Sequence, residues 1–134
     1  MVCIYCGKET KVTNSRLQKR SNSVWRRRRC SVCKAIFTTI ENPNYSTSVI
    51  VVSNKTTLPF SPEKLFLSVY DSLKHRPRAI DDTKYICETV TRKMIDSLNG
   101  GQISASSIRN LIMITLNRFD KTAAVHYQAF HPNN

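Results

Sequence analysis

The stretch that decides the fold of the first part of this chain begins with CIYC at residues 3–6 and ends with CSVC at residues 30–33. Each quartet is a Cys-x-x-Cys knuckle, and 23 residues separate the two knuckles. Four thiolates complete the tetrahedral shell of Zn²⁺ and leave no position open for water, so the spacing predicts one structural zinc ion per chain. The predicted ligands are Cys3, Cys6, Cys30 and Cys33. The alternative is a pair of disulfides or free thiols, which we disfavour because nothing in the sequence resembles a secreted protein.

Positive charge is concentrated in the same region. The chain has 21 Lys and Arg against 9 Asp and Glu, a net charge of +12, and residues 1–47 hold ten basic and two acidic side chains. A small module with this charge is expected to bind a polyanion such as nucleic acid. The alternative is a surface that is merely solvated.

Four consecutive arginines, Arg26, Arg27, Arg28 and Arg29, directly precede the second knuckle. Side chains alternate between the two faces of a strand, so we expect two of the four to face nucleic acid while the other two flank it or pair elsewhere. Arg16 widens the same patch. Trp25 either stacks on a base or fills the small core.

The organisation is two domains of an α+β protein. Residues 1–45 have the short β-rich segments of an antiparallel zinc ribbon, with a hairpin turn at residues 21–23 and a strand at 36–40. Residues 41–48 are predicted to form a linker, and residues 46–134 a mainly helical domain. The apolar run at 49–52 predicts a buried strand.

Capping residues and apolar periodicity predict three helices in the second domain. Ser61 is expected to cap the first helix, Asp81 or Asp82 the second, and Ser104 the third. The tail after residue 121 is expected to form a short element that ends at Pro132. The apolar stripes on these helices predict core packing.

The sequence disfavours several classes of protein. We expect a cytoplasmic protein with no membrane partner, because no secretory leader and no membrane-spanning run are visible. We also expect no enzymatic activity, because a Cys₄ site offers no Lewis-acid position and no acid–base constellation is apparent. Neither a Walker A motif nor a G-x-G-x-x-G motif is present.

Motifs across nearly the whole chain resemble the bacterial NrdR repressors. In the first half these are Cys3-x-x-Cys6, Asn14-Ser15-Arg16, Arg26-Arg27-Arg28, Cys30-x-x-Cys33 and Phe37-Thr38-Thr39-x-Glu41. In the second half Ser53-Asn54, Pro59-Phe60, Glu63-Lys64-Leu65, Arg76-Pro77 and Asp81-Asp82 are similar to the family's ATP-cone. The resemblance implies a zinc-dependent repressor of ribonucleotide reductase genes that binds double-stranded DNA, responds to ATP and dATP, and forms homo-oligomers.

The resemblance also implies a nucleotide site in the second domain. It places the phosphates near the turn after the buried strand and the base beneath the small sheet. The implied nucleotide-binding residues are Val51, Ser53, Asn54, Lys55, Lys64, His75 and Arg76.

The chain departs from the family pattern at two phosphate-facing positions, where Val52 and His75 replace lysines. We therefore expect weaker nucleotide binding than the pattern suggests. The alternative is a zinc-ribbon protein that binds nucleic acid and whose second domain serves only oligomerisation.

Overall fold

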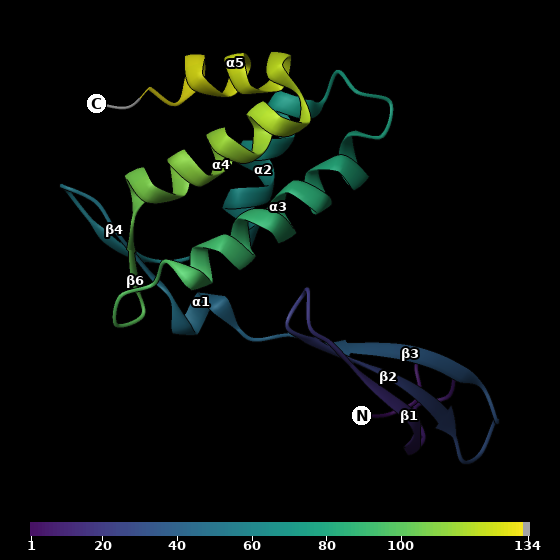
Figure 1. Ribbon diagram of the computed structural model, residues 1–134. Helices are drawn as coiled ribbons and strands as arrows, with labels where there is room; N and C mark the ends of the chain where they lie inside the picture. The colour runs from purple at the N-terminus through teal and green to yellow at the C-terminus, as the bar shows by residue number, and fades with distance from the viewer. Residues whose placement is uncertain (133–134) are drawn as a thin grey trace. The chain divides into compact units, whose positions relative to one another are not determined.

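β-Branched and basic residues in the first 41 positions form a three-stranded antiparallel sheet in the computed structural model, which describes residues 1–132 (Figure 1). The strands, paired in the order β1-β2-β3, are β1 (Thr10–Gln18), β2 (Ser23–Cys30) and β3 (Ile36–Glu41). This arrangement confirms the predicted antiparallel ribbon.

The hairpin turn between β1 and β2 lies where the sequence predicts it. Asn22 has a φ of 48°, a left-handed conformation that asparagine tolerates better than most residues. The Ser21 and Ser23 hydroxyls lie 2.7 Å apart, and Ser23 also donates to the Gln18 side chain at 3.1 Å. Local polar contacts therefore close this turn.

The first compact unit is Met1–Pro43, and a second unit begins at Asn44, two residues before the predicted domain boundary. The predicted linker at 41–48 is partly wrong, because Tyr45–Ser48 form the short helix α1. The Thr47 hydroxyl donates to the Asn44 carbonyl at 3.0 Å, and the Tyr45 ring packs against the core of the second unit. These contacts tie α1 to the second unit.

The second unit contains a small mixed sheet in the order β5-β4-β6. Its strands are β4 (Ile50–Val52), β5 (Thr57–Pro59) and β6 (Gln102–Ser104). Only β4 was predicted. Strand β5 holds Pro59, which is tolerated because the strand lies at an edge. Strand β6 is three residues long and pairs in parallel with β4, so its partner is distant in sequence.

Four longer helices complete this unit: α2 (Pro62–Leu73), α3 (Ala79–Asp96), α4 (Ala105–Phe119) and α5 (Lys121–Phe130). The hydroxyls of Ser61 and Ser104 accept backbone N–H groups of α2 and α4, as predicted. Helix α5 accounts for the predicted terminal element, and Asp120 caps it through the Ala123 N–H at 3.1 Å.

The predicted cap of α3 is wrong. The helix starts at Ala79, and Arg78 occupies the N-cap position, so Asp81 and Asp82 fall in the first turn. Carboxylates there still favour the positive end of the helix dipole. Asp82 also accepts a hydrogen bond from Arg76, a residue that sequence spacing does not connect with it.

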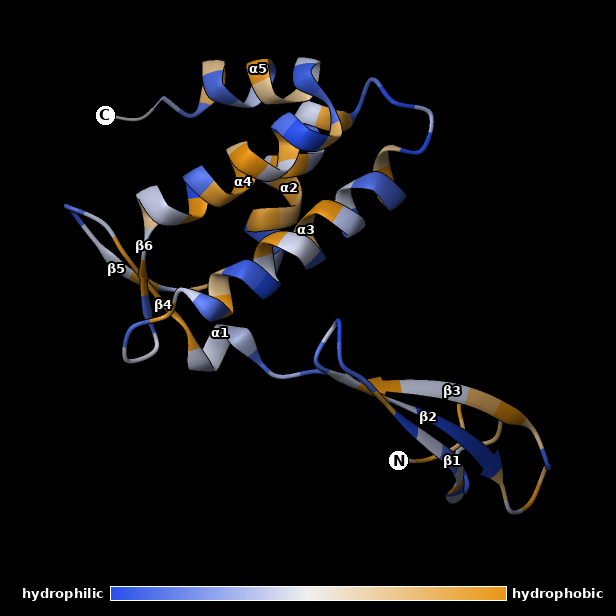
Figure 2. Cartoon of the chain, in the orientation of Figure 1, coloured by the Kyte–Doolittle hydropathy of each residue, from blue (hydrophilic) through white to orange (hydrophobic). Residues whose placement is uncertain are grey.

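The apolar faces of these helices meet in one core, in agreement with the predicted stripes (Figure 2). Val69, Leu73, Ile86, Val90, Met94 and Leu116 are fully buried. Among residues 1–132, none of the helices combines the length and apolarity needed to cross a bilayer.

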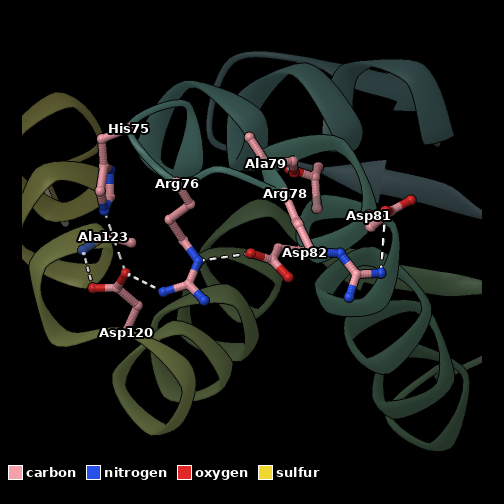
Figure 3. A network of polar contacts seen from close by, with 9 residues as sticks. His75, Arg76, Arg78, Ala79, Asp81, Asp82, Asp120 and Ala123 are labelled. Carbon is pink, nitrogen blue, oxygen red and sulfur yellow. Dashed lines mark hydrogen bonds and ion pairs between the residues drawn. The ribbon is translucent and has the colours of Figure 1, made fainter.

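An ion network joins the end of α2 to the starts of α3 and α5 (Figure 3). The Arg76 guanidinium donates to Asp82 at 2.7 Å and to Asp120 at 2.9 Å, and it lies 4.7 Å from the centre of the Phe119 ring. His75 Nε2 donates to the same Asp120 oxygen at 3.3 Å. The network holds the amino end of α5 against the rest of the unit.

We predict that Arg76→Met destabilises the second unit clearly, because it removes the guanidinium that Asp82 and Asp120 share. Arg78→Met is the matched control. Within residues 1–132 the Arg78 side chain makes only an exposed i,i+3 pair with Asp81, so its loss should cost less than about 0.5 kcal/mol. Urea unfolding followed by far-UV circular dichroism measures both. Equal effects of the two substitutions would contradict a structural role for the network.

The contribution of Asp120 to the stability of the second unit depends on pH. The Ala123 backbone N–H lowers the pKa of Asp120, burial opposes the shift, and Arg76 and His75 add to the lowering. A depressed carboxyl pKa contributes stability that is present above the unfolded value of about 4 and is lost as the pH falls through the folded pKa. The stability difference between wild type and Arg76→Met should therefore shrink below pH about 4.

Candidate functional site

The four predicted zinc ligands converge at one point of the first unit. Their sulfur atoms all lie within 4.8 Å of one another, with 3.7 Å between Cys3 and Cys33 and 3.5 Å between Cys6 and Cys30. A tetrahedral Zn²⁺ with bonds of about 2.3 Å requires sulfurs about 3.8 Å apart. The cluster therefore has the dimensions of a zinc site, and Cys3 and Cys30 form its buried side.

The two knuckles have the same backbone conformation. The Cys3 N–H donates to the Lys8 carbonyl at 2.7 Å, and the Cys30 N–H donates to the Ala35 carbonyl at 2.9 Å, five residues ahead in both cases. The residue after each second cysteine is left-handed, with a φ of 70° at Gly7 and 63° at Lys34. Each knuckle therefore aims two sulfurs at the same point.

Backbone N–H groups also point at the sulfurs. The Tyr5 N–H donates to Cys3 Sγ and the Val32 N–H donates to Cys30 Sγ, both at 3.4 Å. Donors in this position favour thiolate over thiol, which is the form that binds metal.

The thiols compete for ionisation. Burial disfavours the Cys30 thiolate, but hydrogen bonds from the Val32 and Cys33 backbone and from the Cys6 and Cys33 thiols lower its pKa to about 6. The Ala35 backbone favours the Cys33 thiolate, yet burial and the other three sulfurs raise the pKa of Cys33 to about 12. Four adjacent thiolates therefore need a cation among them.

The disulfide alternative, which the sequence disfavours, does not fit the sulfur positions. All five cysteines of the chain are free, and the sulfur pairs are wider than the bond of about 2.05 Å. Cys87 lies in the second unit, where burial raises the pKa of its thiol to about 12. It packs at the edge of the helical core, as an inert apolar side chain would.

The arginine run makes up half of β2 (blue in Figure 2). Its residues alternate between half-buried and exposed. Arg26 pairs with Glu41, and Arg28 donates to the Thr39 hydroxyl at 3.2 Å. Arg27 and Arg29 are exposed, and within residues 1–132 their side chains make no hydrogen bond or ion pair. The run therefore divides into two structural arginines and two arginines free for a ligand.

A β-bulge in β1 enlarges the charged face around Arg27 and Arg29. Lys11 lies opposite Arg29 and Asn14 lies opposite Arg27. Strand β1 therefore has one more residue than β2 over this stretch, and the extra residue is Thr13. The Thr13 hydroxyl donates to the Arg27 carbonyl at 3.2 Å. Without the extra residue, Lys11 and Asn14 would lie on opposite faces.

The register places Arg16 and Trp25 on this same face. Arg16 lies opposite Trp25, and its guanidinium carbon is 5.8 Å from the indole centre. Residues opposite one another in an antiparallel pair share a face, and Trp25 is an even number of residues from Arg27 and Arg29. The small buried cluster is made of Cys3, Cys30 and Phe37 without Trp25. The indole is therefore available on the charged face. We call this surface the basic face; its members are Lys11, Asn14, Arg16, Trp25, Arg27 and Arg29.

The second unit contains a cavity of about 400 Å³ between its small sheet and helices α2, α4 and α5. Three of the predicted nucleotide-binding residues line it, namely Val51, Ser53 and Lys64. Two helices begin at this cavity, because Ser61 and Ala105 are also among its lining residues.

Four of the predicted nucleotide-binding residues do not line the cavity. Asn54 and Lys55 project from the turn between β4 and β5 and are exposed. His75 and Arg76 lie beyond the far end of α2, where they bind Asp120. Lys64 sits in the first turn of α2 and Arg76 lies three residues beyond its last residue, Leu73, so about 14 Å of helix separates the two sites.

Sequence reasoning missed three further lining residues: Arg109, Tyr127 and His131. Burial raises the pKa of Tyr127, whereas Ser68 and the positive charge of Arg109 oppose the rise. The sequence did offer a signal for Arg109. It is a charged residue that directly follows Ile108 and so lies beside the apolar stripe of α4. Helix α5, which carries Tyr127, becomes a cavity wall only through tertiary packing.

Comparisons with known proteins agree with this architecture. The model of the transcriptional repressor NrdR-like N-terminal domain matches residues 1–41. A curated relative, the transcriptional repressor NrdR of Rhodospirillum centenum, is 32% identical over 132 residues, which cover 98% of this chain and 85% of the relative. The first match identifies the sheet with its cysteine cluster as a zinc ribbon.

We predict that the fresh protein holds one zinc per chain and that chelation or Cys30→Ser unfolds only the first unit, because the second unit has its own core. Trp25 is the sole tryptophan, so its fluorescence reports the ribbon, while circular dichroism at 222 nm reports the helices. Cys87→Ala is the matched control and should keep its zinc. A zinc content well below one per chain would contradict a structural site.

Proposed function

The chain belongs to the NrdR family of transcriptional repressors, and we propose that it is a zinc-dependent repressor that binds double-stranded operator DNA through the basic face of its ribbon. The observation that carries this proposal is the convergence of Lys11, Arg16, Arg27 and Arg29 on one exposed face of a sheet. Such a cluster neutralises phosphates, and the planar fork of arginine also matches the guanine edge in the major groove.

The face combines charge with groups that fit DNA chemistry. Trp25 supplies a flat apolar surface, and Asn14 is a residue type that pairs with adenine edges. Arg27 and Arg29 are two residues apart on one strand, which separates them by about 7 Å and lets both contact the same duplex. The zinc ion acts at a distance from DNA, by holding the sheet in shape.

Regulation by nucleotide is the second part of the proposal. We infer that ATP or dATP binds in the cavity of the second unit and changes the oligomeric state of the repressor, as the resemblance to the NrdR family implies. The apolar sheet residue Val51 and the cationic Lys64 on its walls support a ligand with a base and phosphates. Ribonucleotide reductase genes are the proposed targets, and the cytoplasm is the proposed location, because that is where a repressor meets its operators.

One observation favours a different role for the second unit. Val52 stands where the family carries a lysine, and His75 and Arg76 are engaged with Asp120. On the alternative proposal the unit binds no nucleotide and only forms homo-oligomers. Exposed apolar side chains on its helices, among them Leu67, Ile114, Val125 and Phe130, support self-association in either case.

Arg27→Ala with Arg29→Ala should abolish most operator binding and reduce the slope of log K against log salt by about 1.8, because two phosphate contacts are lost. Arg26→Ala with Arg28→Ala is the matched control. It removes the same charge, but those side chains bind Glu41 and Thr39. The control should lower ribbon stability and leave the slope within about 0.5 of wild type. Fluorescence anisotropy across a salt titration measures both variants, and equal slopes would contradict the assignment of the basic face.

Incubation with ATP or dATP separates the two proposals for the second unit. A nucleotide-regulated repressor should change its sedimentation coefficient when either nucleotide is added, and the nucleotide should be recovered intact, because the proposal contains no catalytic step. Analytical ultracentrifugation and chromatography of the nucleotide measure these outcomes. An unchanged oligomer favours the purely structural role, and steady consumption of ATP by the pure protein would contradict the assignment as a non-enzyme.

A further inference from the structure

The cavity of the second unit contains a guanidinium group with an unmet hydrogen-bonding requirement. Arg109 is half-buried on α4 and lines the cavity. Its Nε atom is buried and has no hydrogen-bond partner among the described residues. A buried charged donor without a partner is costly, and proteins normally pair such groups. The arrangement indicates that the partner is a bound anion.

The charges around the cavity also indicate that it binds an anion. Lys64 faces it from α2, and neither Lys64 nor Arg109 takes part in the ion pairs of residues 1–132. Arg76 and Arg78, by contrast, are paired with aspartates. None of the described lining residues is a carboxylate. The cavity is therefore positive without internal compensation.

The imidazole of His131 in the cavity already has hydrogen-bond partners. His131 Nδ1 donates to the Tyr127 carbonyl at 3.1 Å, and its Nε2 accepts from the Ser68 hydroxyl at 3.2 Å. The imidazole also stacks on the Tyr127 ring with 4.2 Å between centres. With both nitrogens used, His131 closes one wall, and the anion is left to Arg109 and Lys64.

We propose that Arg109 and Lys64 together bind the phosphate chain of the nucleotide, between α2 and α4, and that Arg109 is the main determinant of affinity for phosphate. This inference rests on the proposed regulation by nucleotide and deepens it. It moves the phosphates away from the turn with Asn54 and Lys55 and from the pair His75 and Arg76. Val52 stands where the family carries a lysine, so that positive charge is lost. Arg109 compensates for it, because a planar guanidinium can donate two hydrogen bonds to one phosphate. The dipoles of α2 and α4, which begin at the cavity, add to the positive potential.

The test is isothermal calorimetry on the full chain with three probes: ATP, adenosine and inorganic tripolyphosphate. Arg109→Gln should weaken ATP and tripolyphosphate at least tenfold, because a charge-assisted contact is lost. Adenosine, which has no phosphate, should bind within twofold of wild type. Arg109→Lys keeps the charge but loses the fork, so it should give an intermediate loss.

Lys55→Gln is the matched control, because Lys55 is exposed in the turn and lies outside the cavity lining. It should change ATP affinity less than threefold. If ATP binds to wild type and Arg109→Gln binds it equally well while Lys55→Gln does not, the inference is overturned and the proposed function stands. If wild type binds tripolyphosphate through Arg109 but not ATP, the anion site stands and nucleotide regulation fails. If wild type binds neither, both fail.

Discussion

The attraction between four thiolates and one cation is the constraint on which the first unit depends. The buried apolar residues there are Cys3, Cys30 and Phe37, so little apolar surface leaves water when the sheet forms. A core of this size cannot offset the conformational entropy of about forty residues. In both knuckles the N–H of the first cysteine donates to the carbonyl five residues ahead, so the two loops hold their sulfurs alike. Metal binding can then provide the missing free energy and fix the ends of β2 and β3.

Everything proposed for DNA depends on the geometry that the metal holds. Strand β2 runs directly into Cys30, so the orientation of Arg29 and its neighbours follows from the position of a zinc ligand. The bulge at Thr13 then turns β1 so that Lys11 and Arg16 join Arg27 and Arg29. Arg27 and Arg29 share this face through alternation along β2, and the extra residue in β1 lets cations from both sides of the bulge join them. Arg26 and Arg28, equally basic, stabilise the opposite face through Glu41 and Thr39.

The second unit distributes its positive charges between two tasks. At one end of α2, Arg76 is neutralised by Asp82 and Asp120 and holds the helices together. At the other end, Lys64 and Arg109 line the cavity and form no ion pair with any described residue. Helix α5 links both places, since Asp120 caps its start and Tyr127 forms part of the cavity wall. A ligand that shifts α5 would therefore act on the ion network as well.

The sequence by itself determined the zinc ligands, the antiparallel ribbon, the family and most of the helices, because these depend on local spacing: Cys-x-x-Cys turns, β-branched runs, and Ser61 or Ser104 before an apolar period. Tertiary structure alone decided which charges serve which purpose. Strand β6 is only three residues long and pairs with a distant strand, so no local pattern reveals it. Contacts between helices far apart in sequence decide whether Arg76 binds a ligand or Asp120. They also decide whether Arg109 faces solvent or lines a cavity. Alternation along a strand divides four identical arginines into two pairs, but only the register with β1 and β3 decides which pair remains free.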